Sequence, residues 1–305
     1  MSAIKWMDKM KALNNENNVI KTQLGFGCGR LVGGSSFKDS AKLIETALSL
    51  GIQHFDVAPS YGFGTAEDVL GEVLAGDKNI TIATKVGIAR PSNAQSLSFL
   101  KKYLTPLVNS STVIKSLALK TLSKRSQNNR GVFDIESFSA SYEDSLRRLK
   151  RDYIDYLLLH EPTEKDITEE LKKYCDTLLN KGNIGAIGVG FNDEIYTPEI
   201  DFGTVTQRNI GTLDNEKECT DCFSIVHGVM RYSQEQFPGY LNSPAVKKAF
   251  HEMGWKMNNT DIYGAAALGI ALATNSHDVI LVSFKGSKRM IETVKMAHDF
   301  SIILN

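Results

Sequence analysis

The sequence predicts an α/β protein with the (β/α)8 TIM barrel fold, and three observations support this prediction. Short apolar segments with strand character alternate with amphipathic helical segments, which is the pattern of parallel βα units. Eight such strand segments can be recognised, which is the number that closes this barrel. A chain of 305 residues is long for one ordinary domain but suits one α/β barrel. We therefore expect a single (β/α)8 domain over residues 1–305.

Each expected strand is a short apolar run bounded by turn-forming residues. The expected strands are 22–27, 54–58, 80–84, 153–159, 184–191, 203–207, 223–227 and 278–283. Apolar residues recur at helical spacing between these strands. The expected helices are 38–50, 64–74, 135–150, 164–179, 243–253, 260–273 and 287–299. Only roughly a dozen residues separate the strands around the fifth to the seventh, so the helices there are expected to be shortened or missing.

A long segment, residues 90–133, interrupts the alternation after the third strand. It carries eight lysines and arginines and no acid. Insertions of this length in a compact domain are usually functional or mobile, and its position predicts that it projects over the barrel face where the third strand ends. As a solvated loop it has no further role. As a lid it would raise the positive potential over the site and favour an anionic substrate. A further alternative is that its apolar residues pack against a partner subunit, which would make the protein an oligomer.

The overall composition limits the classes of function. Lysine plus arginine equals aspartate plus glutamate at 35 each, so no net charge draws the chain to nucleic acid or to membranes. No apolar run has the length of a signal peptide or of a membrane span. The four cysteines are too few for a disulfide scaffold, so a cytoplasmic protein is expected. Cys219 and Cys222 form a lone CxxC without the further ligands that a zinc site needs, so no metal site is expected.

Four residues with acid–base chemistry stand at or just after the ends of expected strands. Asp56 and Tyr61 lie at and just beyond the end of the second expected strand. Lys85 stands at the end of the third and His160 at the end of the fourth. Barrels build their active sites at this edge. A lysine cation beside a tyrosine lowers the pKa of the phenol, an aspartate holds the lysine charged, and a histidine orients a carbonyl oxygen or assists proton transfer. On spacing alone the alternative is a structural ion pair between Asp56 and Lys85, with His160 capping a strand.

The glycine-rich turns do not complete a dinucleotide-binding motif. After the three Gly-x-Gly clusters, the pattern G-x-G-x-x-G needs glycine at positions that hold Arg30, Glu67 and Asp193. Any nicotinamide cofactor must therefore be bound in another way.

Three parts of the chain resemble the sequence motifs of the aldo-keto reductases. They are 55–67 with 70–74 (the aspartate and tyrosine motif), 82–87 (the lysine motif) and 145–149 with 152–160 (the histidine motif). The motifs follow the family's order and lie on the expected strands. The likeness covers most of the chain from about Leu24 onward and is weaker between 192 and 260. Segment 186–192 and the long third loop look most like the branch of aldose and fucose dehydrogenases.

The resemblance implies a mechanism and a cofactor. NADP(H), with NAD(H) as the alternative, binds across the barrel mouth and exchanges a hydride with a carbonyl carbon. Tyr61 protonates the carbonyl oxygen or takes the proton in the reverse direction, Lys85 and Asp56 tune Tyr61, and His160 positions the substrate oxygen. The implied cofactor contacts are Gly27, Asp56, Asn192, Gln207, His227, Lys285, Arg289 and Glu292.

Within this set, Gln207 matches the family's glutamine for the nicotinamide amide, and His227 replaces the aromatic residue that stacks on the ring. Arg289 is expected to face the 2′-phosphate, because a guanidinium suits phosphate geometry, and Glu292 to meet the adenine. Lysines near Arg289 favour NADP over NAD. The family's serine–asparagine pair after the fifth strand is changed, since the asparagine, Asn192, comes one place late.

We therefore expect an NADP(H)-dependent oxidoreductase that acts on the carbonyl or alcohol carbon of a small aldehyde, ketone or sugar. Two alternatives stay open. One is a sugar C1 (aldose) dehydrogenase running in the oxidative direction. The other is a non-catalytic NADPH-sensing regulatory subunit, because the resembled family includes channel-associated members. The presence of all four catalytic positions favours an enzyme.

Overall fold

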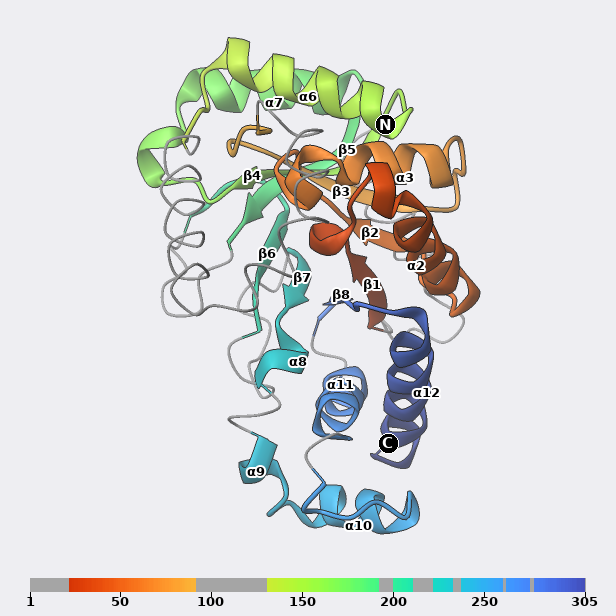
Figure 1. Cartoon of the computed structure of the whole chain (residues 1–305). Coiled ribbons are helices and arrows are strands. Elements are labelled where there is room, and N and C mark those ends of the chain that lie inside the picture. Colours follow the sequence, from red (N-terminus) through yellow and green to blue (C-terminus); the bar gives the residue numbers. More distant parts are fainter. Residues whose placement is uncertain are drawn as a thin grey trace, which may run out of the picture.

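Eight parallel strands form a closed barrel, which confirms the expected fold (Figure 1). The computed structural model describes residues 22–91, 131–191, 200–210, 222–232, 237–259, 262–274 and 277–304. The strands are β1 (Gln23–Gly27), β2 (His54–Asp56), β3 (Thr81–Val86), β4 (Ile154–His160), β5 (Ile184–Gly190), β6 (Val205–Asn209), β7 (Phe223–His227) and β8 (Val279–Val282). Each strand pairs in parallel with the next along the chain, and β1 pairs with β8 to close the barrel.

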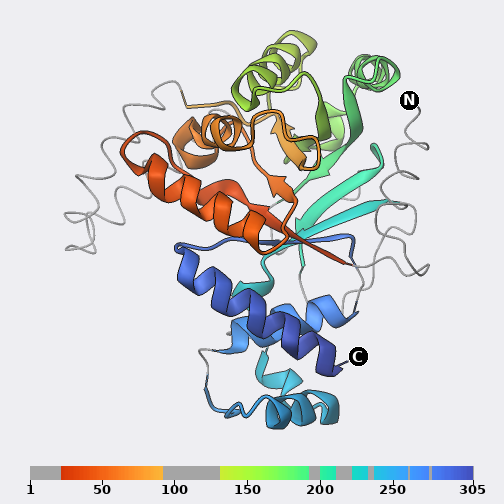
Figure 2. The ribbon, with the colours of Figure 1, turned by 90° about the vertical axis from the view of Figure 1, so that its right-hand side faces the viewer.

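Helices cover the outside of the barrel. They are α2 (Phe37–Ser49), α3 (Ala66–Leu74), α6 (Ile135–Leu149), α7 (Glu169–Asn180), α8 (Val229–Tyr232), α9 (Phe237–Tyr240), α10 (Pro244–Glu252), α11 (Tyr263–Thr274) and α12 (Ser287–Leu304). In Figure 1 and Figure 2, α9 and α10 lie farther from the barrel, beyond α11 and α12. The amphipathic pattern of α2 buries Leu43, Ile44 and Ala47 in the core between helices and strands.

Two expected helix boundaries are wrong. The helix expected over 164–179 is two elements, a short 3-10 helix (η4, Glu164–Asp166) and α7. Thr168 Oγ1 accepts a hydrogen bond from the backbone N–H of Leu171 at 3.1 Å, so a second N-cap starts a new helix inside the segment. The helix expected over 287–299 continues to the end of α12.

Alternation along the strands separates two apolar cores. One core fills the barrel interior, and its buried residues are Ala83, Tyr156, Leu158, Ala186, Val205, Ile225, Val279 and Leu281. The larger core lies between the strands and the helices. Side chains two positions apart on a strand face the same side. Lys85 and His160 therefore share the inward face of β3 and β4 with Ala83 and Leu158, but stand nearer to the carboxyl ends.

Aromatic rings close the amino-terminal end of the barrel interior. The ring of Tyr156 stacks on Phe223 with centroids 4.9 Å apart, and His54 meets Tyr156 edge-on at 5.5 Å. His54 Nδ1 lies 3.0 Å from Thr81 Oγ1. Burial, together with the charge of Lys85, lowers the pKa of His54 to about 3. The imidazole is therefore neutral at physiological pH, and this end of the barrel is a neutral plug.

Parts of several expected elements lie outside the described residues. They are 92–130 of the basic insertion, and 192–199 and 211–221 between β5 and β7. The described residues of the two connections between β5 and β7 form no helix, and α8 and α9 after β7 have four residues each. The expected shortening between β5 and β7 therefore stays a prediction.

Candidate active site

An ion pair between Asp56 and Lys85 lies at the carboxyl ends of β2 and β3. Lys85 Nζ is 2.5 Å from Asp56 Oδ2 and also donates to the carbonyl oxygen of Val57 at 3.0 Å. Both charged residues are 2% exposed. Burial alone would lower the pKa of Lys85, but the charges of Asp56 and Tyr61 and the hydrogen bonds outweigh it and raise the pKa. The ammonium group is therefore held charged, as the sequence predicts.

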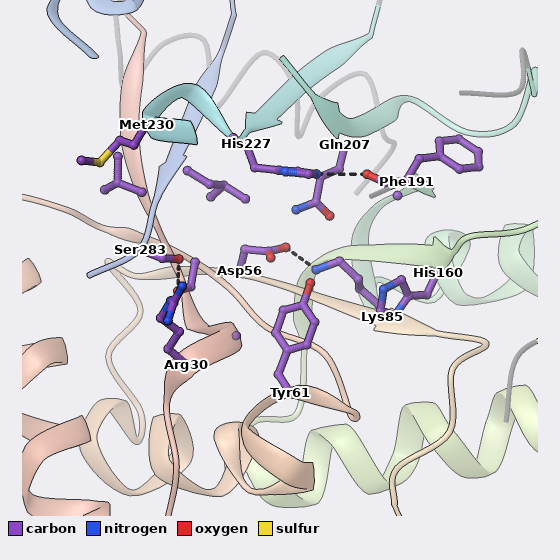
Figure 3. A pocket seen from close by; sticks show the side chains of 16 residues that line it. Arg30, Asp56, Tyr61, Lys85, His160, Phe191, Gln207, His227, Met230 and Ser283 are labelled. Atoms are coloured by element: carbon purple, nitrogen blue, oxygen red, sulfur yellow. Dashed lines mark hydrogen bonds and ion pairs between the residues drawn. The ribbon is translucent and has the colours of Figure 1, made fainter. Parts of the chain in front are cut away.

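The loop after β2 places Tyr61 over this ion pair. Gly62 has φ of 58°, and a Cβ there would lie 1.7 Å from the carbonyl oxygen of Leu31, so only glycine fits. Thr65 Oγ1 donates to Gly62 O at 2.7 Å and accepts from the N–H of Gly33 at 2.9 Å. The first contact closes the loop on itself, and the second binds it to the turn after β1. The Tyr61 hydroxyl consequently points toward Lys85 Nζ (Figure 3), which lies 4.9 Å from the centroid of the Tyr61 ring.

The net direction of the Tyr61 pKa differs from the sequence expectation. Burial raises the pKa of Tyr61, and Asp56 raises it further, while the charge of Lys85 lowers it. The effect of Lys85 has the expected sign, but burial dominates and the phenol pKa lies above its ordinary value. Tyr61 is therefore protonated at neutral pH, the state in which a phenol can donate a proton.

His160 completes the cluster from the end of β4. Its ring meets Tyr61 edge-on, with centroids 6.1 Å apart and planes at 84°. Strand register sets His160 beside Gly190 on β5 and Gly190 beside Gln207 on β6. All four predicted catalytic side chains line one cavity of about 480 Å³ at the barrel mouth (Figure 3).

The predicted cofactor residues divide into three groups. Gly27, Asp56, Gln207 and His227 line the cavity. Lys285, Arg289 and Glu292 are exposed around the start of α12 and do not line it. Asn192 lies outside the described residues.

Two side chains on the cavity wall opposite Tyr61 differ in their hydrogen bonding. His227 Nε2 is 3.0 Å from the carbonyl oxygen of Phe191 (Figure 3). Gln207 is 3% exposed, and its Oε1 has no hydrogen-bond partner among the described residues. A buried amide oxygen without a partner is costly, so this atom is suited to accept a hydrogen bond from a ligand.

Sequence reasoning missed several residues of the cavity wall. They are Gly29, Arg30, Gly190, Phe191, Gly228, Met230, Leu281, Val282 and Ser283. Arg30 is the most informative of these, because it adds a cation to the wall. Among the lining residues that the structure describes, Asp56 is the one acid, and it is already paired with Lys85. Arg30 follows β1 directly in a glycine-rich turn, so the rule that barrel sites lie after strand ends could have found it.

The cysteines that the structure describes are Cys28, Cys175 and Cys222, and Cys219 lies outside the described residues. Cys28 and Cys175 are buried free thiols, and burial raises the pKa of both. Cys222 is disulfide-bonded. Among the described residues, no group of three or more histidine, cysteine or acidic side chains is arranged to hold a metal ion. In the same part of the chain, no helix has the length and apolar character needed to cross a membrane.

Fold and site together define a barrel protein whose mouth holds a phenol, an amine, a carboxylate and an imidazole. The sequence model of the Aldo/keto reductase family matches residues 23–200, which is more than half of the chain. The chain therefore belongs to the aldo/keto reductase family.

Curated relatives are named as reductases and dehydrogenases. The chain is 29% identical over 185 residues to a 6-dehydroglucose reductase of Novosphingobium aromaticivorans, covering 57% of this chain and 48% of the relative. It is 30% identical over 176 residues to a D-threo-aldose 1-dehydrogenase of a Pseudomonas species, covering 55% and 49%. The chain thus spans about half the length of these curated relatives.

Solved structures share the fold over nearly the whole chain. An aldo-keto reductase from Bacillus halodurans in its holo form has a TM-score of 0.61 at 19% identity, covering 93% of this chain and 91% of that one. An aldo-keto reductase from Klebsiella pneumoniae in complex with NADPH has a TM-score of 0.58 at 16% identity, with the same coverage. At these sequence identities, the structural likeness is evidence for the shared fold alone.

Proposed function

We propose that this chain is an NADP(H)-dependent oxidoreductase acting on the carbonyl or alcohol carbon of an aldehyde, ketone or sugar. The observation that carries the proposal is the Tyr61 phenol pointing at the charged Lys85–Asp56 pair inside the mouth cavity. When bound, the cofactor supplies or accepts the hydride. The chain itself has to supply the proton and hold the substrate oxygen.

Tyr61 is the proton donor in the reductive direction. Its hydroxyl gives a proton to the carbonyl oxygen, and the phenolate that forms faces the ammonium of Lys85, which stabilises it. Asp56 keeps Lys85 charged and in place through the 2.5 Å contact. His160, edge-on to Tyr61, is placed to orient the same substrate oxygen. In the oxidative direction the phenolate takes the proton from the alcohol.

The residues present fit a nicotinamide cofactor. Oε1 of Gln207, which has no hydrogen-bond partner among the described residues, can accept from the carboxamide N–H of nicotinamide, a match of donor and acceptor types. Gly27, Asp56 and His227 are further proposed contacts, and they line the cavity. Asn192, outside the described residues, stays a proposed contact on the resemblance alone. Lys285 and Arg289 lie around the N-terminus of the 18-residue helix α12, where backbone N–H groups and cations together suit a phosphate, and Glu292 lies one turn further. This cluster favours NADP(H) over NAD(H).

The charge of the cavity wall bears on the class of substrate. Arg30 adds a cation to the wall of the same cavity that Tyr61 lines. Among the described residues that line the cavity, Asp56 is the one acid, and it is paired with Lys85. A small carbonyl compound or sugar with a phosphate or carboxylate group is therefore favoured. Segment 90–133, proposed as a lid, would add to the same potential.

Two alternatives remain in the proposal. Sugar C1 oxidation is favoured by the relative named D-threo-aldose 1-dehydrogenase. An NADPH-sensing subunit without turnover is the alternative from another class of protein. The intact cluster of Asp56, Tyr61, Lys85 and His160 favours an enzyme over a sensor.

Turnover assays test this proposal. Purified protein is incubated with NADPH and glyceraldehyde, glyceraldehyde 3-phosphate or pyridoxal, and with NADP and a series of aldoses, while absorbance of the reduced cofactor is followed. The proposal expects cofactor-dependent turnover of at least one compound. Tight NADPH binding without any turnover across both panels would contradict the oxidoreductase and favour the sensor.

A further inference from the structure

Glu67 is a fully buried acid that the proposed reaction does not use. It lies in the first turn of α3, directly after the loop that carries Tyr61, and it is 0% exposed. Burying a carboxylate costs free energy unless both oxygens find partners. Oε1 accepts a 2.7 Å hydrogen bond from Thr84 Oγ1, and Oε2 pairs with the guanidinium of Arg90. Both oxygens are therefore satisfied.

Each partner of Glu67 connects to the proposed catalytic residues. Thr84 precedes Lys85 on β3, and because side chains alternate along a strand, Thr84 faces α3 while Lys85 faces the cavity. Arg90 also donates from NH1 to the carbonyl oxygen of Gly64, the last residue of the loop Tyr61–Gly64. Glu67 therefore joins the outer face of the Lys85 strand to the arginine that holds the Tyr61 loop.

A neighbouring ion pair shows what a merely structural contact looks like here. Asp68, the next residue of α3, accepts two 2.8 Å hydrogen bonds from Arg148 on α6. Arg148 also pairs with Asp144, which Arg90 contacts as well. Among the described residues, neither Asp68 nor Arg148 forms a direct hydrogen bond or ion pair with β3 or with the loop Tyr61–Gly64. The Asp68–Arg148 pair joins α3 to α6 and starts from the residue next to Glu67, so it serves as the matched control.

We propose that Glu67, Thr84 and Arg90 form a positioning unit that sets the place of the Tyr61 phenol relative to Lys85. The proposal rests on the proposed function of Tyr61 as proton donor. The three residues touch neither the cavity nor a reacting atom. They act on catalysis through the loop and the strand that they join, one on each side of the phenol–ammonium contact.

The surroundings of Tyr61 make its titration a sensitive measure of position. Tyr61 faces Lys85 from β3, Asp56 from β2, Cys28 from the turn after β1 and His160 from β4. Of these groups, Lys85 lowers the pKa of Tyr61, whereas Asp56 and Cys28 raise it. A phenol that moves away from Lys85 and stays buried loses the lowering effect but keeps the raising effect of burial, so its pKa rises.

The experiment measures the Tyr61 pKa without any substrate. Protein is labelled with 3-fluorotyrosine, whose phenol titrates nearer to neutral pH, and the 19F signal of Tyr61 is assigned with Tyr61→Phe. The informative variant is Thr84→Val, which removes one hydroxyl without changing any charge, so a shift must come from position. Thr84→Ser keeps the hydroxyl and serves as the rescue. Arg90→Gln tests the loop contact, and Asp68→Asn is the control.

We expect Thr84→Val and Arg90→Gln to raise the Tyr61 pKa, while Thr84→Ser and Asp68→Asn titrate like the unchanged protein. With the best compound from the turnover panel, kcat should fall by about 10- to 100-fold in the first two variants, because small misplacements of reacting groups cost about this much. The dissociation constant for NADPH should stay the same.

Two results would overturn the positioning unit. One is a Tyr61 signal that titrates unchanged in Thr84→Val and Arg90→Gln. The other is an equal shift in Asp68→Asn, which would reduce the unit to general packing between α3 and α6. A raised Tyr61 pKa in a protein without turnover on any panel compound would support the positioning unit and contradict the proposed function. The two proposals therefore fail separately.

Discussion

The two ends of the barrel interior are lined by the same inward faces of the strands, but the amino-terminal end is neutral and closely packed whereas the carboxyl-terminal end is charged and open. His54 and Asp56 are two residues apart on β2, and both side chains are buried. Around His54 the rings of Tyr156 and Phe223 pack closely, and the low pKa of His54, about 3, keeps the plug neutral. Around Asp56 the interior opens into the cavity of about 480 Å³, and a full ion pair is kept.

The difference shows what the ion pair is for. A buried ion pair is weak support for stability, because apolar residues of similar volume often stabilise as well or better. The amino-terminal end shows that this barrel can fill its interior without charges. The Lys85–Asp56 pair at the other end is therefore best explained by the chemistry of the neighbouring phenol, Tyr61.

Removing one charge of the pair should have the largest effect. Lys85→Met leaves Asp56 buried without its partner, so we expect a loss of roughly 3–5 kcal/mol in the free energy of unfolding, together with loss of turnover. Urea denaturation measures the stability. The double variant Asp56→Asn with Lys85→Met makes this end neutral and should recover most of the stability but no turnover. If the double variant were as unstable as Lys85→Met alone, the ion pair would be needed for stability, which would contradict the view that it is kept for the chemistry of Tyr61.

The neutral end predicts a pH effect on stability. The pKa of His54 is about 3 in the folded chain against an ordinary 6.5, so the unfolded chain binds more protons between these values. The contribution of His54 to the free energy of unfolding is complete above pH 6.5 and is lost as the pH falls toward 3. The loss is roughly 4–5 kcal/mol, because each unit of difference between the two pKa values corresponds to about 1.36 kcal/mol. In urea denaturation, His54→Gln should weaken this acid dependence. The same pH slope in both proteins would show that His54 is not the cause.

Around the start of α12, the cofactor prediction is tested by charge removal. Arg289→Ala should weaken NADPH binding by about 10- to 100-fold, since hydrogen bonds to charged groups contribute about 1.5–3 kcal/mol, while NADH binding changes little. Fluorescence titration with both cofactors measures this. Lys295→Ala, an exposed cation later on the same helix, is the control. Equal losses for NADPH and NADH would exclude Arg289 from the 2′-phosphate site.

Arg30 is expected to have the smallest effect. Arg30→Gln should raise KM for glyceraldehyde 3-phosphate by about fivefold relative to glyceraldehyde, since one exposed charge contributes at most about 1 kcal/mol. Lys38→Gln on α2 controls for net charge. If the dissociation constant for NADPH rises instead and the two KM values move together, Arg30 binds a cofactor phosphate rather than the substrate.

The sequence predicts the barrel and the four catalytic candidates because both follow from short-range rules. Period-2 alternation puts Asp56, Lys85 and His160 on the inward face, and parallel strands bring their carboxyl ends to one edge. The same rules would have reached Arg30, had the turn after β1 been treated as a strand end.

Other features depend on contacts that the sequence does not reveal. The pKa of Tyr61 is raised because burial outweighs Lys85, and burial is a property of the packed loop. The bond from Arg90 to Gly64 spans 26 residues and has no local pattern. The break before α7 comes from Thr168 acting as an N-cap inside a segment whose apolar spacing alone predicts one helix.

The central claim, that Tyr61 is the proton donor, is tested most directly by Tyr61→Phe. The variant keeps the ring and removes only the hydroxyl, so NADPH binding by fluorescence titration should be unchanged. Turnover of the best compound in the panel should fall by about 10²- to 10⁴-fold, the usual contribution of a general acid. Unchanged binding with this loss is the result that the account predicts, and unchanged turnover would contradict it.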